Sequence, residues 1–146
     1  MAATFNPMAA STLREAGIDL REFWQNLSDD FTLTASDGAE YRFICSDKID
    51  EIMQDELASD MCLLGCFNSN FLADILNLPE VLISAAQTAG AYEAIGETVI
   101  QFNKLEDLQE AYVNADGYGH HFAYYDHEEL ELTINSEQSF YMFRIN

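Results

Sequence analysis

The apolar positions of this chain change from a helical period to an alternating one and back, and these changes predict the order of its elements. Helical spacing runs through residues 11–27, with a break near Gly17 and an N-cap candidate at Asp19. Alternating runs over residues 31–35 and 41–45 then flank Asp37-Gly38, a dipeptide typical of tight hairpin turns. The first third therefore predicts a helical segment followed by a β-hairpin.

The middle of the chain has mostly helical patterns. Residues 46–57 place apolar side chains on one helix face and carboxylates on the other, and Ser46 or Asp47 can cap that helix. Further helices are predicted over residues 69–76, 79–89 and 104–114, the second with Pro79 in its first turn. Two segments stay open: residues 61–67 are a short apolar run, and residues 91–102 fit a helix but also, from Glu97 on, a strand.

The last third alternates again and predicts strands over residues 121–125, 129–134 and 140–145, with a turn at 135–138. Helices grouped between two groups of strands indicate an α+β fold with an antiparallel sheet. We expect an N-terminal helix and β-hairpin, a central helical region and a C-terminal antiparallel β meander. Residues 1–10 are expected to be a flexible leader, and residues 11–146 a single acidic domain.

The charge of the chain narrows its possible partners. It has 26 Asp and Glu against 6 Lys and Arg, a formal net charge of -20, and no Lys or Arg between Lys48 and Lys104. Such self-repulsion disfavours the compact state, so the acidity carries a cost. Binding to nucleic acid or to an anionic membrane relies on Lys and Arg, which argues against both as direct partners. A basic protein surface is the natural complement.

Two groups of carboxylates are candidates for contact with a basic partner. Asp47, Glu51 and Asp55 recur every fourth residue, so on a helix they would stack about 6 Å apart, similar to successive phosphates of one DNA strand. Glu129 and Glu131 would project from one face of a strand. A plain solvated helix face is the alternative, although such faces mix both signs. The predicted partner-binding residues are Asp47, Asp50, Glu51, Asp55, Glu56, Glu128, Glu129 and Glu131.

The other chemically reactive side chains match no standard motif. Residues 120–129 combine histidines with acids, the residue types that bind zinc, but at no standard spacing, which favours a solvated turn. Cys62 and Cys66 are separated by three residues rather than two, and no second pair exists, so we expect both to pack in the core, as we expect of Cys45. We therefore predict no catalytic residues, no metal and no cofactor.

Together these features favour a non-enzymatic acidic binding protein, a DNA mimic that inhibits a nucleic-acid-binding protein in the manner of anti-restriction or anti-CRISPR inhibitors. Three alternatives stay open: an immunity or antitoxin-like protein for a basic nuclease, a salt-adapted small protein, and a small metal-dependent enzyme that uses residues 120–129. Three cysteines and a start without a cationic or apolar leader favour the cytoplasm. Both a monomer and a homodimer are compatible with the pattern.

Overall fold

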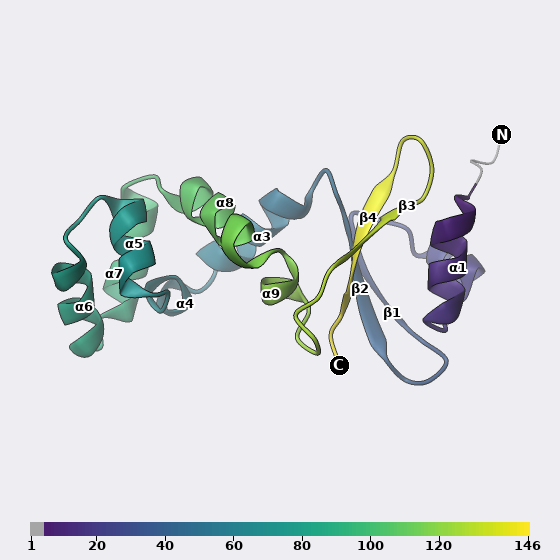
Figure 1. Cartoon of the computed structure of the whole chain (residues 1–146), viewed down its shortest axis with the longest axis horizontal. Helices are drawn as coiled ribbons and strands as arrows, with labels where there is room; N and C mark the ends of the chain where they lie inside the picture. The colour runs from purple at the N-terminus through teal and green to yellow at the C-terminus, as the bar shows by residue number, and fades with distance from the viewer. Residues whose placement is uncertain (1–4) are drawn as a thin grey trace. The chain divides into compact units, whose positions relative to one another are not determined.

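The computed structural model describes residues 5–146 and divides the chain into two compact units (Figure 1). Unit 1 joins the chain up to Ile49 with Asp116–Asn146, and unit 2 is Asp50–Ala115. The predicted α+β architecture is confirmed, with N-terminal helices, central helices and C-terminal strands. That residues 11–146 form a single domain stays a prediction. Of the expected leader, residues 1–4 lie outside the described part of the chain, while the residues from Pro7 on are helical.

Unit 1 begins with two short helices, α1 (Pro7–Glu15) and α2 (Leu20–Gln25). Helix α1 starts four residues earlier than predicted, because Asn6 caps it by accepting a hydrogen bond from the amide of Met8, and proline suits a first helical position. The break predicted at Gly17 is confirmed; its φ of +85° is a conformation that favours glycine. As predicted, the Asp19 carboxylate caps α2.

Four antiparallel strands form the sheet of unit 1, in the order β1-β2-β4-β3. They are β1 (Asp30–Thr34), β2 (Glu40–Cys45), β3 (Leu130–Thr133) and β4 (Ser139–Arg144). The two hairpins, one from each end of the described chain, meet where β2 pairs with β4. This register leaves β1 and β3 at the edges and confirms both predicted hairpins.

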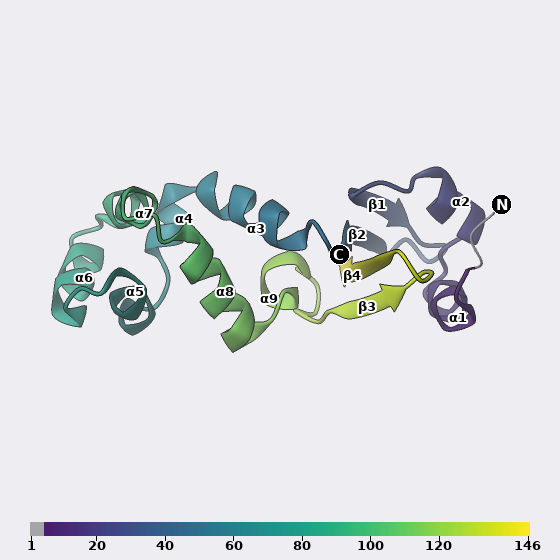
Figure 2. The same ribbon diagram turned by 90° about the horizontal axis from the view of Figure 1, so that it is seen from above.

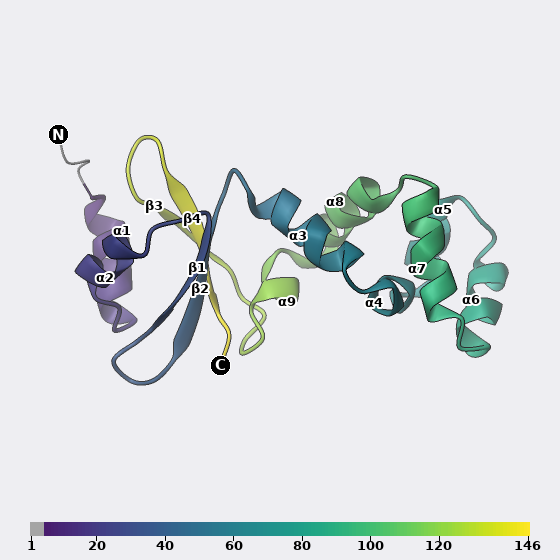
Figure 3. The same cartoon turned by 180° about the vertical axis from the view of Figure 1, so that it is seen from behind.

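Phe23 of α2 lies at the centre of the core of unit 1. It is fully buried, and its ring centroid lies 5.4, 5.2 and 5.9 Å from those of Phe31, Phe43 and Phe140. Because successive strand residues point to opposite sides, these three rings share one sheet face, which α1 and α2 cover (Figure 3). The opposite face carries Arg42, Tyr141 and Glu131 instead.

The strand predicted over residues 121–125 is wrong. Gly119–Phe122 is the short helix α9, and the residues after it form a turn in which His127 has a φ of +58°. Phe122 is buried against Phe143, with ring centroids 5.1 Å apart. The apolar alternation that predicted a strand thus reflects packing onto the sheet rather than pairing within it.

Unit 2 is helical throughout. Its elements are α3 (Ile49–Ala58), α4 (Met61–Gly65), α5 (Ser69–Leu76), α6 (Glu80–Thr88), α7 (Tyr92–Gln101) and α8 (Leu105–Asp116). The three later predicted helices are confirmed within two residues at each end, whereas α3 starts three residues later than expected. The open segment at residues 91–102 is helix α7, which buries Ile95 and Val99. Among the described residues, no helix has the length and apolar character that a membrane span requires.

Two glycines let helices α4 and α7 approach closely. A Cβ atom on Gly65 would overlap the backbone carbonyl of Tyr92, and one on Gly96 would overlap that of Met61. Gly65 and Leu64 are the buried residues of α4, which turns Cys62 and Cys66 outward to solvent. The expectation that these two cysteines pack in the core is therefore wrong, because glycine is the residue that faces α7. Cys45 is half-buried.

Candidate protein-binding interface

The eight predicted binding residues are divided between the two units. Four of them follow one another on or near α3, but Asp47 lies in the turn before the helix and belongs to unit 1. The predicted row of Asp47, Glu51 and Asp55 on one helix face is therefore wrong at its first member. Glu51 and Asp55 do lie on α3, one turn apart, and both are exposed.

Glu56 does not share the face of its neighbour Asp55. Each residue of an α-helix is rotated by about 100° from the one before it. This rotation places Glu56 beside Ile52 and Met53, on the side of α3 that faces the protein, where it is half-buried. Of the four predicted residues on α3, only Asp50, Glu51 and Asp55 remain exposed on the outer side.

Helix α8 crosses α3 at an angle, and the two helices run in broadly opposite directions (Figures 1 and 2). Gln109 of α8 holds the contact, and at 1% exposure it is the one buried polar residue in the described chain. Its amide nitrogen donates to Asp50 Oδ1 at 2.9 Å, and its amide oxygen accepts from Gln54 Nε2 at 3.1 Å. A buried amide satisfied at both ends fixes how the two helices meet.

This contact places carboxylates of both helices on one side of the helix pair. On α3, Met53 is buried on one side of the Gln109 contact. Glu51 and Asp55 lie on the other, exposed side of that contact. On α8, Glu106 and Glu110 lie on the side away from the buried residues of that helix. Because the two helices run in broadly opposite directions, these sides face toward the same part of the surface. We name this surface the α3–α8 acidic face; it comprises Asp50, Glu51, Asp55, Glu106 and Glu110.

The spacing of carboxylates along each helix of the acidic face resembles that of phosphates along a nucleic-acid strand. Glu51 and Asp55 on α3, and Glu106 and Glu110 on α8, are each one helical turn apart, a repeat of about 6 Å. The face therefore presents negative charge at a regular interval on both helices.

Cations within unit 2 are almost absent. Residues 50–115 contain twelve carboxylates and a single basic residue, Lys104, whose ammonium lies 3.4 Å from Asp107 Oδ2. Glu106 and Glu110 are one turn apart, a spacing at which like charges repel each other. The sequence pattern placed both on a helix but did not assign them to the interface, because only the packing of α8 on α3 joins them to Asp50.

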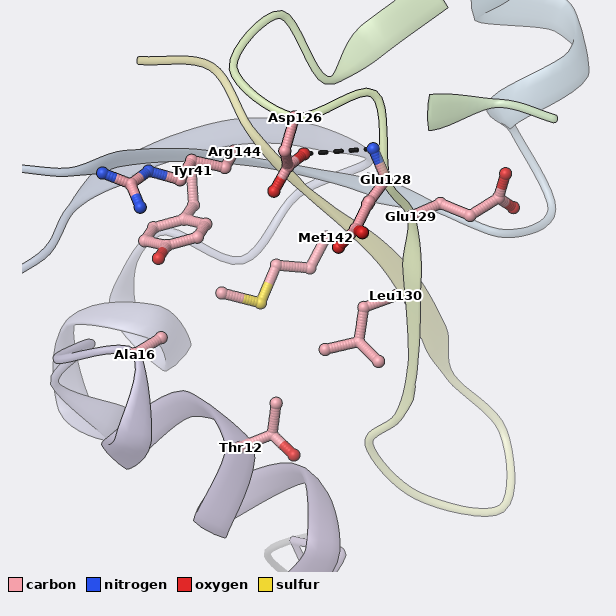
Figure 4. Close-up of a pocket in the computed structure, with 9 residues that line it drawn as sticks. All are labelled: Thr12, Ala16, Tyr41, Asp126, Glu128, Glu129, Leu130, Met142 and Arg144. Carbon is pink, nitrogen blue, oxygen red and sulfur yellow. Dashed lines mark hydrogen bonds between the residues drawn. The ribbon is translucent and has the colours of Figure 1, made fainter. Parts of the chain in front are cut away.

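Two of the predicted acids of unit 1, Glu128 and Glu129, line a pocket of about 290 Å³ between α1 and the sheet (Figure 4). Leu130 and Met142 point into it, and Glu128 lies at its rim, where its backbone amide donates to Asp126 Oδ1 at 3.0 Å. Glu129 points away and accepts from the amide of Gly119 at 3.2 Å. The structure thus spreads these acids over two sides of the chain.

Glu131 lies on the opposite sheet face, where Oε2 is 3.4 Å from the hydroxyls of Ser46 and Ser139. The one cation at the pocket is the Arg144 guanidinium, which stacks 3.8 Å from the centre of the Tyr125 ring. The predicted acids of unit 1 therefore lie on different sides of the sheet and do not form a row.

The histidine-rich segment has no metal-binding geometry in the described part of the chain. The rings of His120 and His127 lie 5.2 Å apart, yet no three His, Cys, Asp or Glu side chains of residues 5–146 are grouped to hold a metal ion. Comparison of the chain with protein families, with curated proteins and with solved structures finds no match. The functional interpretation therefore depends on the geometry and charge of the chain itself.

Proposed function

We propose that this chain is a non-enzymatic acidic binding protein, which imitates nucleic acid and inhibits a nucleic-acid-binding protein by occupying its basic groove. The observation that carries the proposal is the α3–α8 acidic face, to which two helices joined at Gln109 each contribute exposed carboxylates one turn apart. Ordinary solvated surfaces intersperse both signs of charge, whereas unit 2 offers one lysine. The partner's arginines would pair with these carboxylates bidentately.

The hydrogen bond that joins α3 and α8 adds no positive charge to the face. Gln109 orients the Asp50 carboxylate with a neutral amide, so that contact does not cancel its negative charge. A lysine or arginine at this buried position would have formed an ion pair and neutralised one member of the row. Helices held in fixed register also present the carboxylates without further ordering, which lowers the entropic cost of binding.

Such an interface makes a kinetic prediction as well. Complementary fields steer the encounter of two proteins and raise the association rate, and salt screens this effect over about 8–10 Å. Binding to the partner is therefore expected to weaken as the salt concentration rises, mainly through a slower association rate. Duplex DNA would compete for the same groove.

The proposal is tested by a pull-down from a bacterial lysate at low salt, with three forms of the chain as bait. The first is the native sequence. The face variant carries Asp55→Lys, Glu106→Lys and Glu110→Lys; the control variant carries Glu15→Lys, Asp29→Lys and Glu40→Lys, at exposed positions of unit 1. Both variants change the formal charge equally. Bound proteins are eluted with a salt gradient and identified by mass spectrometry.

We expect a nucleic-acid-binding protein on the native and control baits, released by moderate salt and by added duplex DNA, and its loss from the face variant. Equal capture by the two variants would show that total charge alone is responsible. Capture that duplex DNA does not reverse would also contradict mimicry, because the bound groove would not be the one that holds nucleic acid.

A further inference from the structure

Strand β3 is an edge of the sheet, and no strand of residues 5–146 pairs with its outer side; just past its end, the amide of Asn6 donates to the Ile134 carbonyl at 2.7 Å. Ile134 donates to the Gln138 carbonyl at 2.9 Å. In an antiparallel ladder the hydrogen-bonded pairs alternate, so Leu132 and Leu130 also bond toward β4, opposite Phe140 and Met142. The N–H and C=O groups of Glu131 and Thr133 therefore point away from β4. Within residues 5–146, no backbone group pairs with them.

A groove of about 230 Å³ follows this edge between β3 and α1. Residues 130–133 line it on the strand side, and α1 contributes Met8, Ala9 and Thr12. Leu130 and Thr12 also line the adjoining pocket, where Figure 4 shows both pointing inward. Met8 is 79% exposed and Leu130 45% exposed, so apolar surface accompanies the free backbone groups. An added strand lies about 4.8 Å from its neighbour, and alternate side chains would enter this groove.

The charge around the edge decides between possible occupants. Glu131 lies on the edge strand itself, Glu129 precedes it, and Asp126 and Glu128 line the adjoining pocket. A second copy that paired its own β3 with this edge would bring acidic strands together, and like charges on facing strands destabilise a sheet. A segment with Lys or Arg on one face and apolar side chains on the other complements both faces of β3.

We infer that the open edge of β3 accepts an extended segment of a partner protein as a fifth strand, with basic and apolar side chains in alternation. The basic residues of that segment lie on the side of Glu131, and the apolar ones contact Leu130, Leu132 and Met8. Main-chain hydrogen bonds give such strand addition its affinity, and the alternating side chains give its specificity. The inference rests on the proposed function only for the basic character of the partner.

The test uses the full chain and a fluorescent nine-residue peptide of alternating Arg and Val, with binding followed by anisotropy. Two further peptides carry N-methyl groups, one on all Arg amides and the other on all Val amides. Because only one edge of the peptide faces β3, one methylated peptide is expected to lose about tenfold or more in affinity and the other to keep it. Equal binding of both would show attraction by charge without strand addition.

A matched pair of proline variants tests the edge itself. Thr133→Pro removes an outward N–H of β3 but no hydrogen bond to β4, which proline tolerates on an edge strand. Thr32→Pro does the same on β1, the other edge, where the pairs Ala35–Ala39 and Cys45–Asp29 show that Thr32 also points outward. We expect Thr133→Pro to weaken peptide binding about tenfold and Thr32→Pro to leave it unchanged; equal effects would overturn the inference.

Self-association of the chain through β3 would also depend on this edge, and it has its own signature. A dimer that sediments without peptide and that Thr133→Pro abolishes would identify a second copy as the occupant of the edge. That result would overturn the inference that a basic segment binds there. The lysate experiment involves charge reversal on unit 2, whereas the peptide experiment depends on Thr133 in unit 1. The two proposals can therefore fail separately: loss of the peptide difference refutes strand addition alone, and equal capture from lysate refutes the acidic face alone.

Discussion

Units 1 and 2 contain similar numbers of carboxylates but very different numbers of basic residues. Unit 1 has fourteen carboxylates and five of the six basic residues, and it pairs some of them: Arg42 donates to both oxygens of Asp30, at 2.8 and 2.7 Å. Unit 2 has twelve carboxylates and one lysine. Its helices place side chains at fixed intervals along an outer face. Unit 2 thus combines a large excess of carboxylates over basic residues with helices that space these carboxylates regularly.

The two units also differ in the kind of packing contact inside them. Unit 1 is held by aromatic rings around Phe23, whereas α4 and α7 in unit 2 meet through Gly65 and Gly96 with their backbones nearly in contact. An aromatic core contributes much buried area for each side chain. A glycine crossing contributes close backbone packing and little side-chain burial. Substitutions at single sites in each unit test this difference.

The largest effect is expected at the centre of the aromatic core. Phe23→Ala removes a fully buried ring that contacts Phe31, Phe43 and Phe140. It should lower the free energy of unfolding by about 3–5 kcal/mol, measured by urea denaturation. Phe102→Ala, at an exposed ring of unit 2, is the control and should change stability by less than about 1 kcal/mol.

The glycine crossing should be the next most sensitive site. Gly96→Ala puts a Cβ against the carbonyl of Met61, and overpacking of this kind costs about 1–3 kcal/mol. Helix propensity alone would stabilise the protein by up to about 1 kcal/mol. A lower unfolding temperature of Gly96→Ala therefore indicates overpacking, and a higher one indicates the propensity effect. Ala94→Gly, at an exposed position on the same helix, measures the propensity effect by itself. A more stable Gly96→Ala variant would show that the backbones are not in contact.

The amide contact between α3 and α8 should give a smaller, pairwise effect. A double-mutant cycle of Gln109→Leu and Asp50→Asn is expected to yield a coupling free energy of about 0.5–1.5 kcal/mol, the usual net value of one hydrogen bond. The same cycle with Asp55→Asn in place of Asp50→Asn should give none, because Asp55 lies on the exposed side of α3. Coupling to Asp55 would mean that Gln109 does not set the register of the two helices.

The smallest effect concerns the cost of the charge itself. Replacing Asp55 by Asn and Glu106 and Glu110 by Gln should raise the free energy of unfolding by about 0.5–1 kcal/mol at low salt, because repulsion between neighbouring carboxylates is removed. The gain should shrink at about 0.5 M NaCl. The same neutralisation at Glu15, Asp29 and Glu40 of unit 1 should gain less, since that unit holds most of the cations. A loss of stability would assign these carboxylates a structural role.

Elements that depend on neighbouring residues could be predicted from the sequence. Asp37-Gly38 indicates the first hairpin because its turn chemistry is local, and Asp19 caps α2 through amides two and three residues away. Helices α5, α6 and α8 follow from their apolar period. The excess of carboxylates is likewise a property of composition and requires no structure. The sequence leaves open whether residues 91–102 form a helix or a strand, because the burial of Ile95 and Gly96 on one side of a helix depends on α4.

The predictions that were wrong concern features that depend on contacts between residues distant in the sequence. Residues 121–125 alternate like a strand, yet they do not form a strand of the sheet, and Phe122 packs on Phe143 from one face of the sheet instead. Cys62 and Cys66 resemble core residues until Gly65 takes the place that faces α7. In both cases the partner that decides the outcome lies at least twenty residues away along the chain.

The acidic face also combines a local feature with a long-range contact. Its carboxylates can be counted in the sequence, but the Asp50–Gln109 contact that joins its two helices links residues 59 positions apart. Periodicity orders side chains around one helix and carries no information about which second helix lies beside it. Composition and local pattern therefore determined how acidic this protein is and where its helices and hairpins form. Only tertiary packing decided which carboxylates share a surface and which strands lie at the edges of the sheet.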